Sequence, residues 1–429
     1  VQHKSGVYMI TTAIIAEFNP LHSGHEYIIR EARRITNADC IVVVLSGSFT
    51  QRGDIAIAPK SVRAAAAIAC GADIVFELPF FYATSSAEFF ASGAVTLLNS
   101  AGGIDYLVFG AENNDISVLS SAADMLLCEP PLFKQVLSSC LAKGMSFPAA
   151  RAEAFAGCGG SGDVFTPNNT LAIEYIKALK RLHSPIEPVA IKRIGSDYND
   201  RNYQSKSSFI SASAFREYVS RPHSDDELNT FSDSVLPAES SALLKSACNV
   251  CYPVTNDDFF ILLRYSILMN RSTLTSYCDF TPALYNRINN LIDKYGNELF
   301  SGSYEDFILK IKTKDMTAAR IKRAMLHLVT GCTDNTCRAA YDYLSQGYLP
   351  YARILALSGA GQSYINTIKK GCDIKLINSL GKSMPALDEN ARTLIQTDIL
   401  SSDIYAAIVK SKFNHTLPDE YRAGVIRTV

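Results

Sequence analysis

Two of the seven histidines in this 429-residue chain lie three positions apart, as His22-Ser23-Gly24-His25. An imidazole can donate hydrogen bonds to phosphate oxygens and stabilise the charge that grows during displacement at phosphorus. Gly24 permits close approach of the backbone, and the free N–H groups of a helix that begins at His25 favour an anion. These residues predict a site for the α-phosphate of a nucleotide. The alternative is a helix start with two structural histidines.

A second segment could complete this site. Ser211-Ala212-Ser213-Ala214-Phe215-Arg216 opens another helical pattern. Its hydroxyls, N–H groups and guanidinium suit the β- and γ-phosphates, so we assign Ser213 and Arg216 to the nucleotide. Taken alone, the segment is more simply a helix capped by a serine.

The first half of the chain contains the elements that must position these residues. Short apolar runs that read as strands alternate with helical patterns, and the expected strands are residues 12–17, 40–45, 73–78, 105–109 and 187–191. Continuous apolar strands between helices are typical of a doubly wound parallel sheet, a Rossmann-like α/β fold. Ligands of such sheets bind beyond the carboxyl ends of the strands, where His22 and His25 lie. Residues 9–220 are therefore the expected nucleotide-binding catalytic domain.

Several charged residues lie near the same sheet edge. Arg52 follows the second expected strand and could orient a carboxylate or a phosphate, although an exposed loop arginine is the alternative. Lys60 and Arg63 read more readily as part of a solvated helix face. Glu77 and Glu112 could orient ribose hydroxyls or magnesium, but a helix cap or a structural hydrogen bond is the slightly preferred interpretation.

The second half of the chain has helical patterns instead of alternating strands and helices. Residues 221–240 form a connection, and the patterns that follow are helical, including residues 352–358, so residues 221–429 are expected to form a mostly α-helical domain. Residues 310–323 hold six bases against one acid: Lys310, Lys312, Lys314, Arg320, Lys322 and Arg323. Such a stretch can follow an RNA backbone, and the alternative is a solvated amphipathic helix.

Composition narrows the classes of function. The net charge of -1 gives no overall basic field, so any RNA binding must come from a local patch. No apolar run approaches the length of a membrane span, and the first residues do not resemble a secretory signal. Eleven scattered cysteines suit a reduced, cytoplasmic chain. Cys248 and Cys251 have the spacing of metal ligands, but we expect structural thiols and no metal site in the protein itself.

The ordered motifs resemble the nucleotidyltransferase superfamily that includes class I aminoacyl-tRNA synthetases, whose catalytic domain has the Rossmann-like HUP fold. Within it, the chain is most similar to the bacterial tRNA-Met cytidine acetate ligases. The resemblance spans residues 12–216 and, beyond the two motifs above, includes Glu17-Phe18-Asn19-Pro20, Ser46-Gly47-Ser48-Phe49-Thr50-Gln51-Arg52-Gly53, Phe109-Gly110-Ala111-Glu112, Pro167-Asn168-Asn169 and Lys192-Arg193.

This resemblance implies a two-step reaction. Acetate is activated by ATP as acetyl-adenylate, and the acetyl group then passes to the exocyclic amine of the wobble cytidine of elongator tRNA-Met, which becomes N4-acetylcytidine. His22, His25 and Arg52 are the expected catalytic residues, and magnesium is expected with ATP. No membrane or DNA partner is expected.

The resemblance also places the binding residues. Its ATP contacts fall on Gly110, on Asn168 or Asn169, on Arg193 and on residues 15–28: Ile15, Ala16, Glu17, Phe18, Asn19, Pro20, Leu21, His22, Ser23, Gly24, His25, Glu26, Tyr27 and Ile28. In the basic stretch, where the resemblance is weaker, tRNA contacts are expected from the positive charge at Lys310, Lys312, Lys314, Arg320 and Arg323. Asp315-Met316 stands where the family tends to have Arg-Tyr, so these two positions are not expected to contact RNA in the same way.

Two other classes share parts of this pattern. An adenylyl- or cytidylyltransferase that acts on a small phosphorylated metabolite would use the same paired motifs but is usually more compact. A nucleotide-dependent RNA-binding protein without catalysis would not need His22, Gly24 and His25 together.

Overall fold

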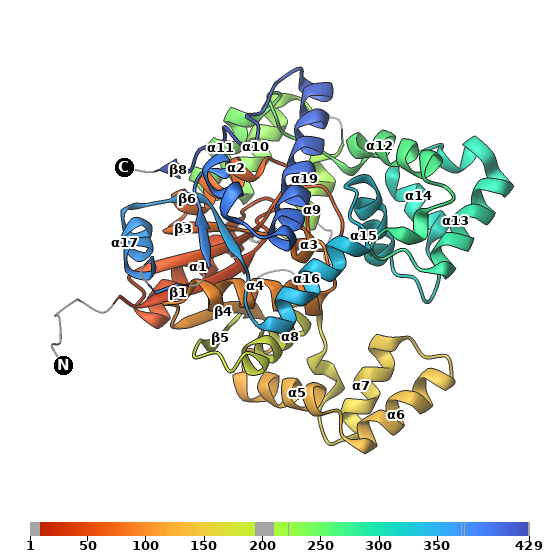
Figure 1. Cartoon of the computed structure of the whole chain (residues 1–429), viewed down its shortest axis with the longest axis horizontal. Coiled ribbons are helices and arrows are strands. Elements are labelled where there is room, and N and C mark those ends of the chain that lie inside the picture. The colour runs from red at the N-terminus through yellow and green to blue at the C-terminus, as the bar shows by residue number, and fades with distance from the viewer. Residues whose placement is uncertain (1–8, 194–209, 222, 370, 373, 428–429) are drawn as a thin grey trace.

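The computed structural model describes residues 9–193, 210–221, 223–369, 371–372 and 374–427, and at its centre lies an eight-stranded sheet (Figure 1). The strand order is β5-β4-β1-β2-β3-β6-β7, and β8 pairs with β6. All five strands expected from the sequence are present and parallel: β1 (Thr11–Ala16), β2 (Cys40–Ser46), β3 (Ile74–Leu78), β4 (Tyr106–Ala111) and β5 (Glu187–Lys192). The expected Rossmann-like α/β fold is confirmed.

Alternation along β2 explains why the sheet is covered on both sides. Ile41, Val43 and Leu45 belong to the core formed with α1 (Ser23–Thr36) and α2 (Lys60–Ala69). Val42 and Val44 point the other way, into the core shared with α4 (Ala87–Ala101), α8 (Pro167–Arg181) and α17 (Gly359–Ile368). Because successive strand residues face opposite sides, an unbroken apolar run is what a doubly covered strand requires.

The order of the strands creates the place for a ligand. The chain passes from β1 to β2 and β3 on one side, and then returns to β4 and β5 on the other side of β1. The loops that leave β1 and β4 therefore diverge, and in open α/β sheets the crevice between such loops binds ligands.

The second half of the chain also contributes strands, which corrects one expectation. Residues 352–358 were predicted as helix, but β6 (Tyr351–Leu357) is a fully buried strand that pairs antiparallel with β3. The run is of strand length and lies between Pro350 and Gly359, and a short run buried on all sides cannot be told from a helix by periodicity. β7 (Lys375–Ile377) and β8 (Ile426–Arg427) pair with it. A boundary near residue 220 stays a prediction.

Two groups of helices extend away from the sheet (Figure 1). One lobe consists of α5 (Ile116–Cys128), α6 (Pro131–Ala142) and α7 (Phe147–Gly157), drawn orange to yellow below the sheet. The other lobe consists of α12 (Asn256–Met269), α13 (Pro282–Tyr295), α14 (Tyr304–Ile311) and α15 (Ala318–Val329), at the right of the view. The second half is mostly helical, as expected.

The remaining elements connect or cover these parts. The other helices are α3 (Phe80–Ala83), α9 (Ala212–Val219), α10 (Asp225–Val235), α11 (Ala238–Ala247), α16 (Asp334–Gln346), α18 (Leu380–Ser383) and α19 (Glu389–Phe413). Short 3-10 turns occupy Gly162–Val164, Leu274–Ser276, Gly296–Phe300 and Met384–Ala386. In the described part of the chain, no single helix is long and apolar enough to cross a membrane, while α5 and α6, bent by 82°, pass that test as a pair on length and composition alone.

The cysteines differ in part from the expectation of reduced thiols. Cys278 and Cys337 are joined by a disulfide, a pairing that the sequence did not predict. Cys248 and Cys251 are free thiols, the first partly buried and the second buried, and their structural role stays a prediction.

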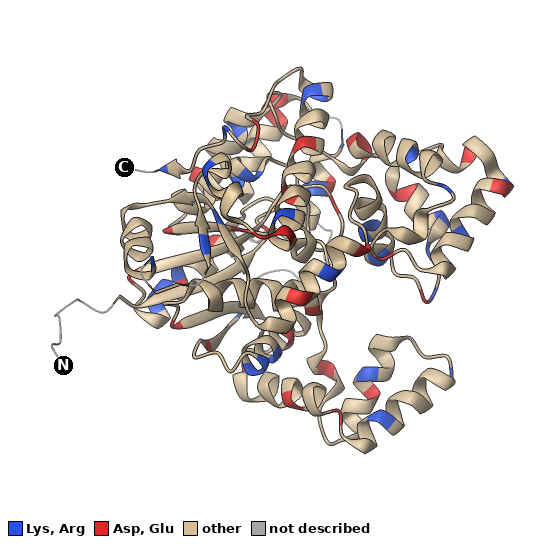
Figure 2. Ribbon diagram, in the orientation of Figure 1, with Lys and Arg blue, Asp and Glu red and all other residues tan. Residues whose placement is uncertain are grey.

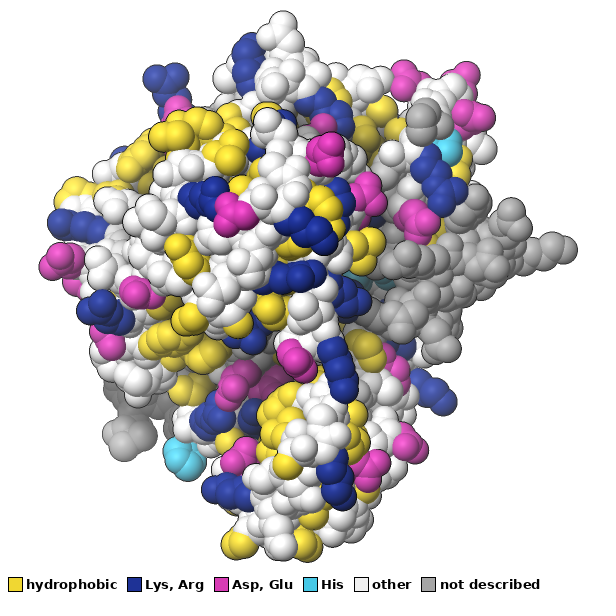
Figure 3. All heavy atoms as spheres, turned by 90° about the vertical axis from the view of Figure 1, so that its right-hand side faces the viewer, with side chains coloured by type: hydrophobic (Ala, Val, Ile, Leu, Met, Phe, Trp, Pro, Cys, Tyr) yellow, Lys and Arg dark blue, Asp and Glu magenta, His cyan; other side chains and the backbone are white. Residues whose placement is uncertain are grey.

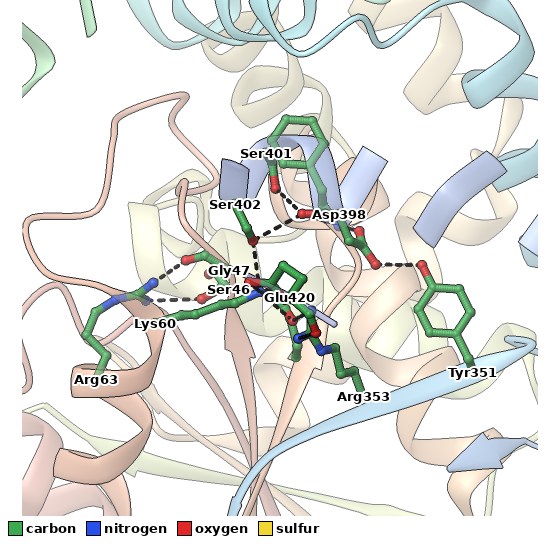
Figure 4. A network of polar contacts seen from close by, with 12 residues as sticks. Ser46, Gly47, Lys60, Arg63, Tyr351, Arg353, Asp398, Ser401, Ser402 and Glu420 are labelled. Carbon is green, nitrogen blue, oxygen red and sulfur yellow. Dashed lines mark hydrogen bonds and ion pairs between the residues drawn. The ribbon is translucent and has the colours of Figure 1, made fainter. Parts of the chain in front are cut away.

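A buried group of charges fixes the last part of the chain against the sheet (Figure 4). Lys60 Nζ lies 2.7 Å from a carboxylate oxygen of Glu77 and 3.0 Å from one of Glu420, and Arg353 pairs with both acids. Ser402 of α19 accepts a further hydrogen bond from Lys60. Lys60 is therefore not on a solvated helix face, and Glu77 is engaged in structural ion pairs rather than facing a nucleotide.

Candidate active site

A cavity of about 490 Å³ lies at the carboxyl ends of β1 and β4, at the reversal of strand order. This volume is in the range of cofactor and substrate sites. Its walls come from the ends of β1 and β4, the start of α1, the loop after β2, α4, the α5–α7 lobe, the start of α8, the residue after β5 and the start of α9. The described lining residues include Ile14, Ile15, Ala16, Glu17, Phe18, Asn19, His22, His25, Ile28, Gln51, Arg52, Gly110, Arg151, Phe165, Asn168, Tyr175, Arg193, Ser211, Ser213 and Arg216.

The two histidines meet at the start of α1. His22 is the N-cap, and its Nδ1 accepts the backbone N–H of Gly24 at 3.1 Å. The Nδ1 of His25 accepts the backbone N–H of His22 at 3.3 Å. The two rings stack with their centroids 3.8 Å apart, and Phe18 packs edge-on against His25. Each ring is therefore held by the backbone of the helix start.

Both imidazoles are neutral at physiological pH. Burial, assisted by the positive charges of Arg193 and Arg216, lowers the pKa of His22 from 6.5 to about 3. Burial also lowers the pKa of His25 well below 6.5, with smaller effects from His22 and Arg193, partly offset by the Pro20 carbonyl. Since Nδ1 accepts a hydrogen bond in each ring, the single proton of the neutral ring resides on Nε2. The pair can thus donate to an anion without carrying charge.

Four arginines line the described part of the cavity: Arg52, Arg151, Arg193 and Arg216. Arg216 lies in α9, and its Nη1 donates to the Asn19 carbonyl at 2.8 Å. Arg193 follows β5, and Arg52 lies in the loop after β2. Guanidinium groups are suited to phosphates and carboxylates because they donate two parallel hydrogen bonds. The cavity can accept a polyanion together with a second anion.

Arg151 was not predicted from the sequence. It lies in α7, its guanidinium stands 4.5 Å from the centre of the Phe165 ring, and its Nε is buried. The helix around it is alanine-rich and belongs to the lobe between β4 and α8. A single arginine in an alanine-rich helix, with Glu153 as the other charged residue, was the signal available in the sequence.

Glu17 is the one carboxylate among the described residues that line the cavity. Its Oε1 accepts the backbone N–H of Gln51 at 2.7 Å. Arg63 also fixes this segment, because its guanidinium donates to the carbonyls of Glu17 at 2.7 Å and Ser46 at 3.1 Å. Burial raises the pKa of Glu17, and the Gln51 N–H, Arg216 and Arg52 partly offset it. Arg63 is therefore a buried structural residue and not part of a solvated face.

One carboxylate beside a triphosphate is compatible with magnesium. Mg²⁺ commonly takes one or two carboxylates, phosphate oxygens and several waters. Glu17 is the residue in the described lining that fits this role, and magnesium stays a prediction.

The two asparagines of the expected ATP contact have different surroundings. Asn169 is buried, and its Oδ1 accepts the backbone N–H groups of Glu112 at 2.9 Å and Asn113 at 3.0 Å. Asn168 lines the cavity, and its Nδ2 donates to Glu112 at 2.5 Å. Glu112 also accepts from Thr166. Glu112 and Asn169 thus fix the start of α8, which leaves Asn168 as the residue placed to reach a ligand.

Gly110 brings the end of β4 close to two other wall residues. A Cβ at this position would lie 3.0 Å from Ile28 Cδ1 and 3.2 Å from Arg193 Cγ. Glycine therefore lets Arg193 lie against the β4 end.

Some residues predicted to bind ATP do not line the cavity. Leu21 is buried in the core, and the Ser23 hydroxyl donates to the Val235 carbonyl at 3.2 Å. The others outside the described lining are Pro20, Gly24, Glu26, Tyr27 and Asn169. Gly24 still matters to the site, because its N–H orients His22.

The basic stretch divides into exposed and buried residues. Lys310, Lys312, Lys314 and Arg320 are exposed. Arg323 is buried, with its Nε 3.5 Å from a carboxylate oxygen of Asp279, so the expectation that it contacts RNA does not fit its position. Lys314 Nζ donates to the Gly144 carbonyl of the α6–α7 turn at 2.5 Å, so this base lies against the α5–α7 lobe. Figure 2 shows that Lys and Arg residues of the α12–α15 lobe are interspersed with Asp and Glu.

A fold of this kind, with stacked neutral histidines and four arginines at its switch point, defines an enzyme that acts on a nucleoside triphosphate. The sequence model of the HIGH Nucleotidyl Transferase family matches residues 9–419. The chain therefore belongs to the HIGH nucleotidyl transferase family.

Individual proteins that are similar to this chain carry more specific names. The tRNA(Met) cytidine acetate ligase of Caldicellulosiruptor saccharolyticus is 37% identical over 398 residues, covering 93% of this chain and 94% of that protein. The protein of the same name from Acetivibrio thermocellus is 34% identical over 433 residues, covering 97% and 100%. The crystal structure of Thermotoga maritima TmcAL bound with α-thio ATP is 27% identical, with a TM-score of 0.84 over 98% of this chain and 100% of that one.

Proposed function

We propose that the chain is an ATP-dependent carbon–nitrogen ligase that forms acetyl-adenylate from acetate and acetylates the wobble cytidine of elongator tRNA-Met. The names of the curated relatives support the reaction and its RNA substrate. The α-thio ATP bound to the similar Thermotoga maritima protein supports ATP as the nucleotide. The observation that carries the proposal is the pair of stacked, neutral histidines beside four arginines at the switch point.

In the first step, an acetate oxygen attacks the α-phosphorus of ATP in line with the bond to the β-phosphate. The new P–O bond forms as the bond to the bridging oxygen breaks, and pyrophosphate leaves with the negative charge. The Nε2–H groups of His22 and His25 would donate to the α-phosphate oxygens, where charge grows. Arg216 with Ser213 would hold the β- and γ-phosphates, and Arg52 would orient acetate.

Neutral histidines suit this step. Acetate and ATP are both anions, so the site must neutralise charge and align two reactants rather than remove a proton. Arginines provide the positive charge, and imidazoles that keep their Nε2 proton provide directed donors. Glu17 would hold magnesium, which when bound adds charge neutralisation at the phosphates.

In the second step, the exocyclic nitrogen of cytidine attacks the acetyl carbon. The C–N bond forms, the bond to the AMP oxygen breaks, and the nitrogen loses one proton. No described side chain is assigned as the base for that proton. The cytidine would approach along the exposed bases Lys310, Lys312, Lys314 and Arg320. Figure 3, which views the molecule from the side of the α12–α15 lobe, shows several Lys and Arg side chains on that face, interspersed with Asp and Glu. The cytoplasmic location expected from the sequence stays a prediction.

Transfer to RNA tests this function directly. The purified chain is incubated with ATP, labelled acetate and an elongator tRNA-Met transcript, and the digested RNA is examined for labelled N4-acetylcytidine. A transcript with uridine at the wobble position is the matched control and should remain unlabelled. Label on a small phosphorylated metabolite instead of RNA would favour the metabolite transferase. No turnover of ATP under any of these conditions would favour a binding protein.

A further inference from the structure

The loop of residues 51–54 lies between the cavity and α15. On one side, Gln51 N donates to Glu17, and Arg52 lines the cavity. On the other side, Gly53 lies directly on α15: a Cβ at this residue would be 2.6 Å from both the Arg323 backbone nitrogen and the Lys322 carbonyl carbon. The φ angle of Gly53 is +79°, a conformation that favours glycine. The 51–54 loop thus connects the proposed ATP site to the second half of the chain.

Lys322 of α15 forms an ion pair with this loop. Its Nζ lies 2.8 Å from Asp54 Oδ1 and 2.5 Å from Glu305 Oε1. The Lys322 side chain is 11% exposed and that of Asp54 16%. Asn256 of α12 donates to the same Asp54 oxygen at 2.9 Å, and its Oδ1 accepts the Ile55 N–H at 3.0 Å. Asp54 is therefore fixed by α12 and α15 together.

The geometry of the loop links Asp54 to Arg52. Thr50 N donates to the Asp54 carbonyl at 2.9 Å, and Gly53 N donates to the Thr50 carbonyl at 2.9 Å. These two bonds close a tight turn around Arg52, so a displacement of Asp54 moves the backbone that carries Arg52. The other end of the turn is fixed by Glu17 through Gln51.

We propose that Lys322 is a positioning residue for the first half-reaction: through Asp54 it holds the 51–54 loop so that Arg52 faces the cavity. This inference rests on the proposed function. It gives the basic stretch two roles, because its exposed residues face RNA while Lys322 faces inward to the catalytic loop. From the sequence, Lys322 was counted in the basic stretch but was not assigned a tRNA contact.

Acetate-dependent ATP–pyrophosphate exchange without RNA separates these two roles. Lys322→Met keeps the length of the side chain but removes its charge. We expect kcat/KM for acetate to fall roughly 10- to 100-fold, as for other displacements of a positioned group, with unchanged affinity for tRNA. Lys322→Arg should restore part of the activity, because a guanidinium can still pair with Asp54. Lys382→Met, at an exposed lysine of α18, is the matched control and should exchange like the parent chain.

The double variant Lys322→Met/Asp54→Asn distinguishes a loss of activity from a loss of folding. Removing both partners leaves no unpaired buried charge, so this variant should fold while its kcat/KM for acetate is lowered about as much as in Lys322→Met alone. Normal exchange by a folded Lys322→Met protein would overturn the proposal. Normal exchange combined with weakened tRNA binding would overturn it in favour of a direct RNA contact. Absence of exchange in the parent chain would instead refute the proposed function.

Discussion

His22 and His25 stack ring on ring, with centroids 3.8 Å apart, and each accepts a backbone N–H through Nδ1. This relationship determines how both residues can act. The Nδ1 atoms are used by the helix start, so only Nε2–H remains for a ligand. The histidines are therefore donors to an anion rather than proton acceptors.

Removal of one imidazole should slow adenylate formation strongly without unfolding the chain. We expect His25→Ala to lower acetate-dependent ATP–pyrophosphate exchange by roughly 10²- to 10³-fold, the effect of losing one donor to a developing negative charge. His415→Ala, at an exposed histidine, serves as the control and should retain exchange. Comparable exchange by the two variants would remove His25 from the mechanism.

The buried histidines should also make stability depend on pH. The folded chain keeps His22 unprotonated down to about pH 3, whereas the unfolded chain binds a proton below about 6.5. Protonation therefore favours the unfolded chain as pH falls. The contribution of His22 to the free energy of unfolding is fully present only above the pKa of the unfolded chain. Between pH 7 and pH 5 this group should cost about 2 kcal/mol of unfolding free energy. Urea unfolding at both pH values, with His22→Asn as the comparison, measures this. An equally steep loss in His22→Asn would show that other groups are responsible.

The two asparagines at the start of α8 should respond differently to replacement by alanine. Asn168→Ala should raise KM for ATP roughly tenfold, the cost of a lost hydrogen bond to a charged group. Asn169→Ala should instead lower stability by about 1–3 kcal/mol, because two backbone N–H groups lose their acceptor. Steady-state kinetics and thermal unfolding of both variants test the distinction. A change in KM for Asn169→Ala alone would reverse the assignment.

The exposed bases should set the salt dependence of tRNA binding. Lys312→Ala combined with Arg320→Ala should weaken binding and reduce the slope of log K against log salt by roughly 0.7 to 0.9 for each phosphate that the variant no longer neutralises. Arg323→Ala should mainly destabilise the fold, because it leaves Asp279 without its ion-pair partner. Filter binding across a salt series measures this slope for the parent chain and for the double variant. An unchanged slope in the double variant would mean that these bases are only a solvated surface.

Local pattern in the sequence was sufficient for the strands and the histidine motif. Val42 and Val44 lie in a continuous apolar run, and His22 follows the neighbouring strand of the sheet, so the sheet edge and the nucleotide site could both be predicted. The residues 352–358 were misassigned because a short buried run has the same composition in a helix and in a strand. Only pairing with β3, which lies far away in the first half of the chain, decides between them.

Charged residues were harder to place, because their environment depends on distant parts of the chain. Lys60 looked like a residue of a solvated face but pairs with Glu420, 360 positions away. Arg323 and Lys322 lie in one basic run, yet Asp279 and Asp54 hold them inside the structure. Arg151 reaches the cavity from a lobe whose position no local pattern indicates.

ATP–pyrophosphate exchange by the purified chain, with and without acetate and with no RNA present, tests the central claim most directly. We predict exchange that appears only when acetate is added, because the stacked histidines and the four arginines align acetate with the α-phosphate of ATP. Exchange that is independent of acetate, or its absence when both ATP and acetate are present, would contradict the assignment of this cavity to acetyl-adenylate formation.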